Sequence, residues 1–191
     1  MSLSMSPSAV RFLLNNDVVV LENIDPNLTV LQYLRDERFK SGTKEGCASG
    51  DCGACTVVLA ELSEDNQTLN YKSINACISF VGCLHGKQLI TVEHLKQGAK
   101  LHHVQQAMVD NHGSQCGFCT PGFVMSSFAL HKQNNTPDRA QVLEALAGNL
   151  CRCTGYRSII DAALTSSQHA EADSFEQHYQ QTLRQLIDLH V

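Results

Sequence analysis

The chain has 191 residues, a formal net charge of −5 and nine cysteines. The length suits one average domain or two small ones, and the acidic balance disfavours a nucleic-acid partner held by phosphate attraction. No apolar run reaches the roughly 18 residues that a membrane span needs, and residues 1–14 lack the pattern of a secretory signal. We therefore expect a cytoplasmic protein without nucleic-acid or membrane partners, whose cysteines bind metal or act in redox chemistry.

Short strands and one helix are predicted up to residue 93. The turn signal Asn15-Asn16-Asp17 separates two apolar runs, which predicts a β-hairpin. Thr29 is a suitable cap for a short helix over residues 30–35. The predicted strands are residues 10–14, 18–21, 56–62, 69–73 and 89–92. Strands that enclose one helix indicate a compact mixed sheet.

The following region, up to residue 165, is predicted to be helical. Thr120-Pro121 combines a helix cap with proline at the first helical position, and Thr136-Pro137 repeats this start signal. Thr154-Gly155 precedes a further helix. The predicted helices are residues 100–111, 120–131, 136–146 and a fourth that begins at 154. Four helices with short connections indicate a small bundle.

Residues 166–191 differ in character from both regions. The first of them are polar, and Phe175, Tyr179, Leu183 and Ile187 follow at helical spacing. We expect a linker or helical tail that leads to a following region. A terminal helix that packs on nothing is the alternative.

The first cysteine group is Cys47, Cys52, Cys55 and Cys77. Its spacing, C-x4-C-x2-C followed by a distant cysteine, is that of plant-type [2Fe–2S] ferredoxins. Between Cys47 and Cys55 every residue except Asp51 is Gly, Ala, Ser or Cys, so a tight loop can aim backbone N–H groups at anionic sulfur. A zinc site would use two separate cysteine pairs, whereas Cys77 stands alone. The sequence therefore predicts an iron–sulfur cluster here.

The second cysteine group consists of two pairs, Cys116 with Cys119 and Cys151 with Cys153. In each pair the second cysteine directly precedes a helix-start signal, where the helix dipole and free N–H groups stabilise a thiolate. Two such loops could enclose one cluster. The spacing alone leaves zinc open, and the first group in the same chain favours a second [2Fe–2S] cluster. The ninth cysteine, Cys83, is expected to be a small buried hydrophobe at a strand end.

The sequence shows no substrate-converting constellation. It has no G-x-S-x-G, no phosphate-binding glycine loop and no G-x-G-x-x-G motif. No C-x-H pair marks a Rieske-type centre. His102-His103 are expected on a helix, at the protein surface or in its core, rather than as metal ligands. We therefore predict electron transfer, with a zinc-binding interaction module as the alternative from another class.

With both cysteine groups placed, the chain resembles the iron–sulfur portion of the molybdenum hydroxylases, the xanthine dehydrogenase and aldehyde oxidase family. The matching segments are residues 42–56, 75–77, 113–123 and 148–157. The resemblance implies an α+β fold with three parts. These are a β-grasp, plant-type ferredoxin-like domain at residues 9–93, a four-helix [2Fe–2S] domain at 94–165, and a linker or helical tail at 166–191 toward an FAD domain.

Within the family, residues 11–15 and 104–110 look most like the small subunit of bacterial xanthine dehydrogenases. This implies purine hydroxylation at a molybdopterin cofactor on a large subunit. Electrons would pass through the helical cluster, then the ferredoxin-like cluster, and then to FAD. Gln115 and Cys153 would lie beside the molybdopterin. The alternative is the small subunit of a relative that acts on carbon monoxide, an aldehyde or an N-heterocycle. The chain alone, with no place for molybdenum or flavin, is not expected to be catalytically competent.

Overall fold

The computed structural model describes residues 9–168 and 172–190. Most of the segment searched for a secretory signal, and residues 169–171 and 191 of the tail, lie outside the described residues. The described chain forms a five-stranded sheet surrounded by helices, which confirms the expected α+β class. Within that part, no helix combines the length and apolar character needed to cross a membrane.

The sheet is mixed, as expected, with strand order β2-β1-β5-β3-β4. Strands β1 and β5 are parallel, and the other neighbours are antiparallel. Asn15 occupies the β1–β2 turn with φ of 59°, a conformation that asparagine tolerates. The predicted strand at 89–92 ends early because Val92 begins α2, Val92–Leu95. The strands are β1 Val10–Leu14, β2 Asp17–Leu21, β3 Thr56–Leu62, β4 Leu69–Asn75 and β5 Gln88–Ile90.

One face of the sheet is covered by the short helix α1, Val30–Gln32, and the π-helical turn Tyr33–Glu37 that continues it. Thr29 forms the predicted cap, since its hydroxyl accepts from the Gln32 N–H and the Gln32 side chain accepts in return. Val30, Leu34 and Phe12 of β1 are fully buried on this side.

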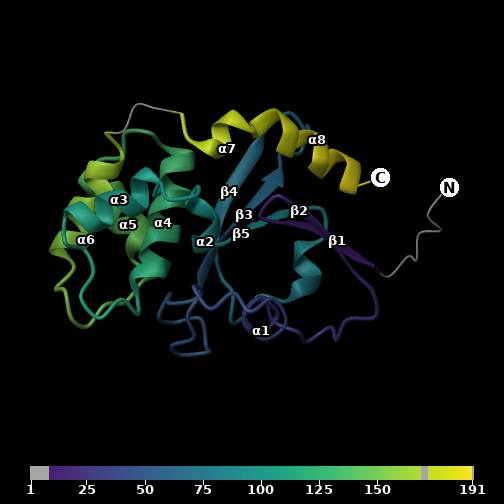
Figure 1. The fold of residues 1–191 in the computed structure, drawn as a ribbon, viewed down its shortest axis with the longest axis horizontal. Coiled ribbons are helices and arrows are strands. Elements are labelled where there is room, and N and C mark those ends of the chain that lie inside the picture. The colour runs from purple at the N-terminus through teal and green to yellow at the C-terminus, as the bar shows by residue number, and fades with distance from the viewer. Residues whose placement is uncertain (1–8, 169–171, 191) are drawn as a thin grey trace.

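The opposite face of the sheet carries helix α4, which lies between the sheet and the other helices (Figure 1). These helices occur where they were predicted. Helix α4 begins at Thr120 as expected, but its N-cap is Cys119 rather than Thr120, and the other three helices each begin three residues later than expected. Asp138, rather than Thr136, caps α5, because its carboxylate accepts from the Gln141 N–H at 2.8 Å. The helices of this region are α3 His103–Asp110, α4 Thr120–Gln133, α5 Arg139–Leu146 and α6 Arg157–Ser166.

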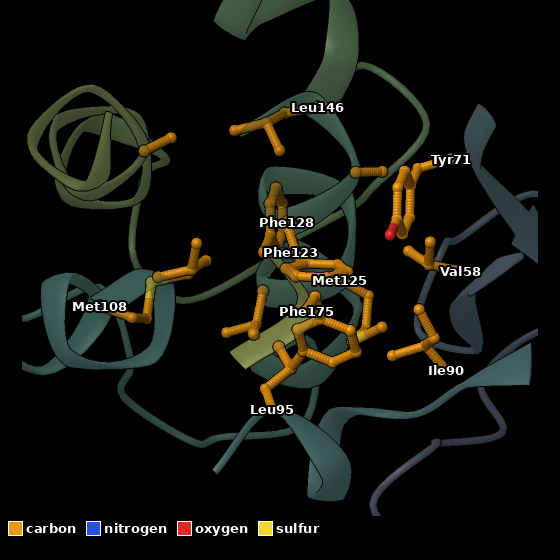
Figure 2. Close-up of a cluster of buried hydrophobic side chains, with 14 of the residues drawn as sticks. Val58, Tyr71, Ile90, Leu95, Met108, Phe123, Met125, Phe128, Leu146 and Phe175 are labelled. Carbon is orange, nitrogen blue, oxygen red and sulfur yellow. The ribbon is translucent and has the colours of Figure 1, made fainter. Parts of the chain in front are cut away.

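A single apolar cluster joins the sheet to the helices. Phe128 of α4 meets Tyr71 of β4 edge to face with ring centroids 6.3 Å apart, and it meets Phe175 at 4.9 Å (Figure 2). Phe123 and Met125 lie in the same cluster and are at most 1% exposed. Each buried aromatic contributes about 1.5–3 kcal/mol. The helical region is therefore held against the sheet by a shared core.

The tail is helical and packs on this core. Helices α7, Ser174–Gln177, and α8, Tyr179–Leu189, cross the top of the view in Figure 1. Phe175 and Leu186 are buried, and the Tyr179 hydroxyl accepts from the Leu69 N–H at 2.9 Å. The alternative of an unpacked terminal helix is wrong, because these apolar side chains find a hydrophobic surface on the sheet and on α4.

The expectation for Cys83 is also wrong. Cys83 is exposed and lies in a 3-10 helix, Val81–Leu84, rather than in a strand. Residues three apart lie above one another in a 3-10 helix. Val81 and Leu84 therefore take the buried side and leave Cys83 on the other.

Candidate metal centres

The loop from Gly46 to Cys55 wraps around the Cys47 thiol. Backbone N–H groups of Ser49 and Asp51 donate to the Cys47 sulfur at 3.4 and 3.3 Å. The turn needs positive φ at Ala48, 55°, and at Gly50, 83°. These N–H groups stabilise negative charge on sulfur, as the small-residue composition predicted.

The other three cysteines of this group gather around the same loop. A Cβ on Gly46 would lie 2.7 Å from the Cys52 sulfur, so only glycine allows the chain to pass so close to it. Cys55 is 2% exposed and is hydrogen-bonded to Cys77. The Asn75 side chain donates to the Gly50 carbonyl at 2.7 Å and so fixes the end of β4 beside the loop. The structure therefore brings the predicted group together.

The thiols of this group differ in electrostatics. Hydrogen bonds from the Ser49 side chain and from the loop backbone lower the pKa of Cys47 to about 6. Burial, together with the neighbouring Cys77 and Cys52, raises the pKa of Cys55 to about 12. Crowded thiols oppose one another's ionisation, and bound cations remove that opposition. The donor set fits an iron–sulfur cluster, which takes cysteine thiolates as ligands.

The second group also converges. The Cys153 sulfur lies 3.6 Å from that of Cys116 and 3.9 Å from that of Cys151. Cys119 is the residue before α4, as expected for a thiolate near a helix N-terminus. The matching expectation for Cys153 is wrong, because α6 starts only at Arg157. Backbone geometry explains this, since Tyr156 precedes the helix with φ of 69°.

Hydroxyl groups near Cys151, rather than a helix N-terminus, stabilise this pair of cysteines. The Thr154 hydroxyl lies 3.1 Å from the Cys151 sulfur, and the Tyr156 hydroxyl accepts from the Cys151 N–H at 2.9 Å. Burial acts to raise the pKa of Cys151, but hydrogen bonds from Thr154, Cys153 and Cys119 together outweigh it and lower the pKa to about 7. Burial and the other three thiols raise the pKa of Cys119 to about 12. This donor set also fits a cluster.

One side of the second group faces solvent. Cys116, Cys153 and Gln115 are exposed, and so are the apolar side chains of Phe118 and Leu150. The residues expected beside molybdopterin therefore lie on an accessible surface.

The two cysteine groups meet at a junction that the sequence reasoning missed. The Leu150 N–H donates to the Cys52 carbonyl at 2.9 Å, and the Asn149 side chain donates to the Gly53 carbonyl at 2.9 Å. Gly122 of α4 lies against the same carbonyl. The one available signal was the position of Gly122 and Asn149 beside cysteine motifs, which does not reveal a contact between distant segments.

Replacing Gly122 by alanine should destabilise this junction. The new Cβ would lie 2.2 Å from the Gly53 carbonyl oxygen, a backbone atom that cannot move aside without shifting the cysteine loop. We expect a loss of about 1–3 kcal/mol in unfolding free energy, measured by urea denaturation. Gly148→Ala is the matched control, because its Cβ would meet nothing within 4 Å. Equal losses for both variants would contradict the close contact.

A third gathering of possible ligands is His102, His103 and Asp173, whose ligand atoms lie within 4.8 Å of one another. Both carboxylate oxygens of Asp173 already accept hydrogen bonds from protein groups. One of its oxygens accepts from His102 at 2.8 Å and from Lys132 at 2.6 Å, and the other caps α7. The Lys132 ammonium supplies the positive charge that a metal ion would bring. We interpret this group as an anchor for the tail.

Comparison with known proteins defines the class. Residues 14–82 match the family described as "2Fe-2S iron-sulfur cluster binding domain", and residues 91–164 match "[2Fe-2S] binding domain". Together they cover both cysteine groups. The chain therefore belongs to the class of iron–sulfur proteins and contains two [2Fe–2S]-binding domains.

Relatives identify the family. The chain is 49% identical over 154 residues to xanthine dehydrogenase of Emericella nidulans, with 81% of this chain and 11% of that protein covered. It is 43% identical over 162 residues to aldehyde oxidase 1 of Rattus norvegicus, with 84% and 12% covered. The chain thus spans about a tenth of the length of these curated relatives.

Solved structures of similar fold point to the same family as the sequence relatives. Quinoline 2-oxidoreductase from Pseudomonas putida 86 contains a chain with a TM-score of 0.72 and 33% identity, with 84% of this chain and 93% of that chain covered. Aldehyde oxidoreductase from Desulfovibrio gigas matches with a TM-score of 0.73 and 30% identity, over 93% of this chain and 18% of that one. The chain belongs to the molybdenum hydroxylase family and corresponds to its iron–sulfur region.

Proposed function

We propose that the chain is an electron-transfer module that holds two [2Fe–2S] clusters. The convergence of four thiols at each of two sites, each inside a matched cluster-binding domain, supports this proposal. The proposed ligands are Cys47, Cys52, Cys55 and Cys77 for the ferredoxin-like cluster, and Cys116, Cys119, Cys151 and Cys153 for the helical cluster.

The chain's own residues bind and shield these groups. Such a cluster, when bound, accepts and releases single electrons. The N–H groups of Ser49 and Asp51 and the hydroxyl of Thr154 lie beside ligand sulfurs and stabilise their negative charge. The small-residue loop admits these donors, and the shared core keeps both sites in fixed places.

The domain arrangement forms part of the proposal. We assign residues 9–93 to a β-grasp, ferredoxin-like domain, supported by the mixed sheet with one short helix on its face. Residues 94–165 form a four-helix cluster-binding domain, supported by α3 to α6. Residues 166–191 are the segment that leads toward an FAD domain. A cytoplasmic location suits the free thiols of both sites.

The proposed electron path runs between a molybdopterin cofactor and FAD on other domains or subunits. The exposed side of the helical site supports a large-subunit contact there, with Gln115 and Cys153 beside the molybdopterin. Electrons would enter at the helical site and leave through the ferredoxin-like site.

For the substrate we propose a purine, hypoxanthine or xanthine. The 49% identity to a xanthine dehydrogenase supports this choice. A separate small subunit of an aldehyde or N-heterocycle enzyme is the second candidate, supported by the quinoline 2-oxidoreductase chain that matches over 93% of its length. Purification of the native complex through a tag on this chain, followed by assays with hypoxanthine, an aldehyde and quinoline, separates the two.

Metal analysis tests the module itself. Anaerobically purified protein should contain about four iron atoms and about four acid-labile sulfides per chain. Dithionite reduction should produce two distinct electron paramagnetic resonance (EPR) signals. Stoichiometric zinc without sulfide would contradict the proposal and support the zinc-binding alternative.

A further inference from the structure

Two backbone segments that are far apart in sequence meet between the cysteine groups. Cys52 belongs to the first group, and Leu150 directly precedes Cys151 of the second. The Leu150 N–H donates to the Cys52 carbonyl at 2.9 Å, so one hydrogen bond connects a residue of one ligand set to the neighbour of a residue in the other.

The side chain beside this bond, Asn149, joins three segments. Its amide nitrogen donates to the Gly53 carbonyl at 2.9 Å and to the Thr56 hydroxyl at 3.1 Å. Its amide oxygen accepts from the Ser126 hydroxyl of α4 at 2.6 Å. Asn149 is 5% exposed, so water does not compete for these bonds.

The backbone at Gly53 and Gly122 packs so closely against the Asn149 side chain that neither glycine position has room for a Cβ atom. Gly53 has φ of 67°, and a Cβ there would lie 2.4 Å from the Gly148 carbonyl and 2.5 Å from the Asn149 amide nitrogen. Gly122 approaches the same amide nitrogen on the α4 side. The junction is therefore shaped around this amide, which uses both of its N–H donors and its oxygen.

We propose that Asn149 is a positioning residue that sets the relative placement of the two cysteine loops, and through it the coupling between the two clusters. This inference rests on the function proposed above. The coupling of two electron carriers depends steeply on their separation and orientation, so a buried contact that fixes both loops controls it. Asn149 touches neither substrate nor ligand sulfur and acts through the Leu150–Cys52 contact.

The test compares Asn149→Ala with the native protein by EPR. With both clusters reduced, nearby electron spins split or broaden each other's signals, and this interaction falls with the cube of their separation. Asn149→Ala should retain iron and sulfide near native levels but lose or clearly change this splitting. Ser126→Ala removes one hydrogen bond to Asn149 and should change the splitting less.

Asn15→Gly is the matched control. Asn15 is a buried amide in the β1–β2 turn whose oxygen accepts from the Thr91 N–H at 3.2 Å, away from the junction. Glycine suits its positive φ, so the variant loses the side chain without backbone strain. It should lower the unfolding temperature as Asn149→Ala does, yet leave the splitting native.

Each outcome has a defined meaning. Native splitting in Asn149→Ala, an equal change in Asn15→Gly, or no splitting in the native protein would overturn the positioning role. If Asn149→Ala yields no folded protein, Ser126→Ala decides, and native splitting in that variant overturns the role. Native protein without iron and sulfide would instead refute the proposed function, so the two failures are distinguishable.

Discussion

Replacing Cys55 by serine is expected to abolish the EPR signal of the ferredoxin-like cluster and leave that of the helical cluster. Cys55 is buried and is hydrogen-bonded to Cys77, so its thiolate closes the site between the loop and the end of β4. A serine hydroxyl is a harder ligand with a far higher pKa, and iron–sulfur sites select soft thiolates. Iron content should fall from about four to about two atoms per chain.

Cys83→Ser is the control for this experiment. Cys83 is exposed and lies outside both ligand sets, so its loss should leave both signals and the iron content unchanged. Loss of both signals in folded Cys55→Ser protein would show that the cysteines are partitioned differently. Retention of both would show that Cys55 is not a ligand.

Replacing Asp173 by asparagine is expected to lower the unfolding free energy by about 3 kcal/mol at neutral pH. The Asp173 and Lys132 side chains are each 5% exposed, and the His102 side chain is 3% exposed. Removing the carboxylate charge leaves the Lys132 ammonium buried, and among the described residues its remaining ion-pair partner is the more exposed Glu176. Breaking a buried ion pair typically costs about 3–5 kcal/mol. The ion pair that Lys132 keeps with Glu176 should reduce this cost to the lower end of the range. Urea denaturation followed by circular dichroism measures the change.

Asp161→Asn is the matched control for Asp173→Asn. Asp161 pairs with Arg139 at 4.0 Å, and their side chains are 47% and 58% exposed. Water screens such a pair, so the change should stay below about 1 kcal/mol. Equal effects of the two substitutions would mean that the tail anchor contributes nothing beyond a surface charge pair.

The same carboxylate predicts a dependence on pH. Burial acts to raise the pKa of Asp173, but hydrogen bonds from His102, Lys132 and the Glu176 N–H, together with the Lys132 charge, outweigh it and hold the pKa below its usual value. A group with a depressed pKa in the folded state stabilises the protein above its unfolded pKa, and this contribution is lost as pH falls toward the folded value. The stability gap between native protein and Asp173→Asn should therefore narrow below about pH 4. A gap that is constant from pH 7 to pH 3 would contradict this.

Local sequence signals predicted much of the fold. The hairpin at Asn15 and the Thr29 cap depend on neighbouring residues only, and both were confirmed. The first residue of each helix was harder to predict from the sequence, because several nearby side chains can serve as the N-cap. Asp138 displaced Thr136 because a carboxylate accepts strongly from the Gln141 N–H.

The sequence alone identified both cysteine groups and the α+β class, because thiol spacing and loop composition are local properties. Only the tertiary structure showed that Leu150 meets Cys52, that Asn149 binds Gly53, and that Asp173 anchors the tail to α4. These contacts join residues separated by about 40 to 100 positions, and no periodicity or motif encodes a pairing at such distances. They form only when the shared core around Phe128 packs the helices against the sheet, and that packing brings the two cysteine groups into contact.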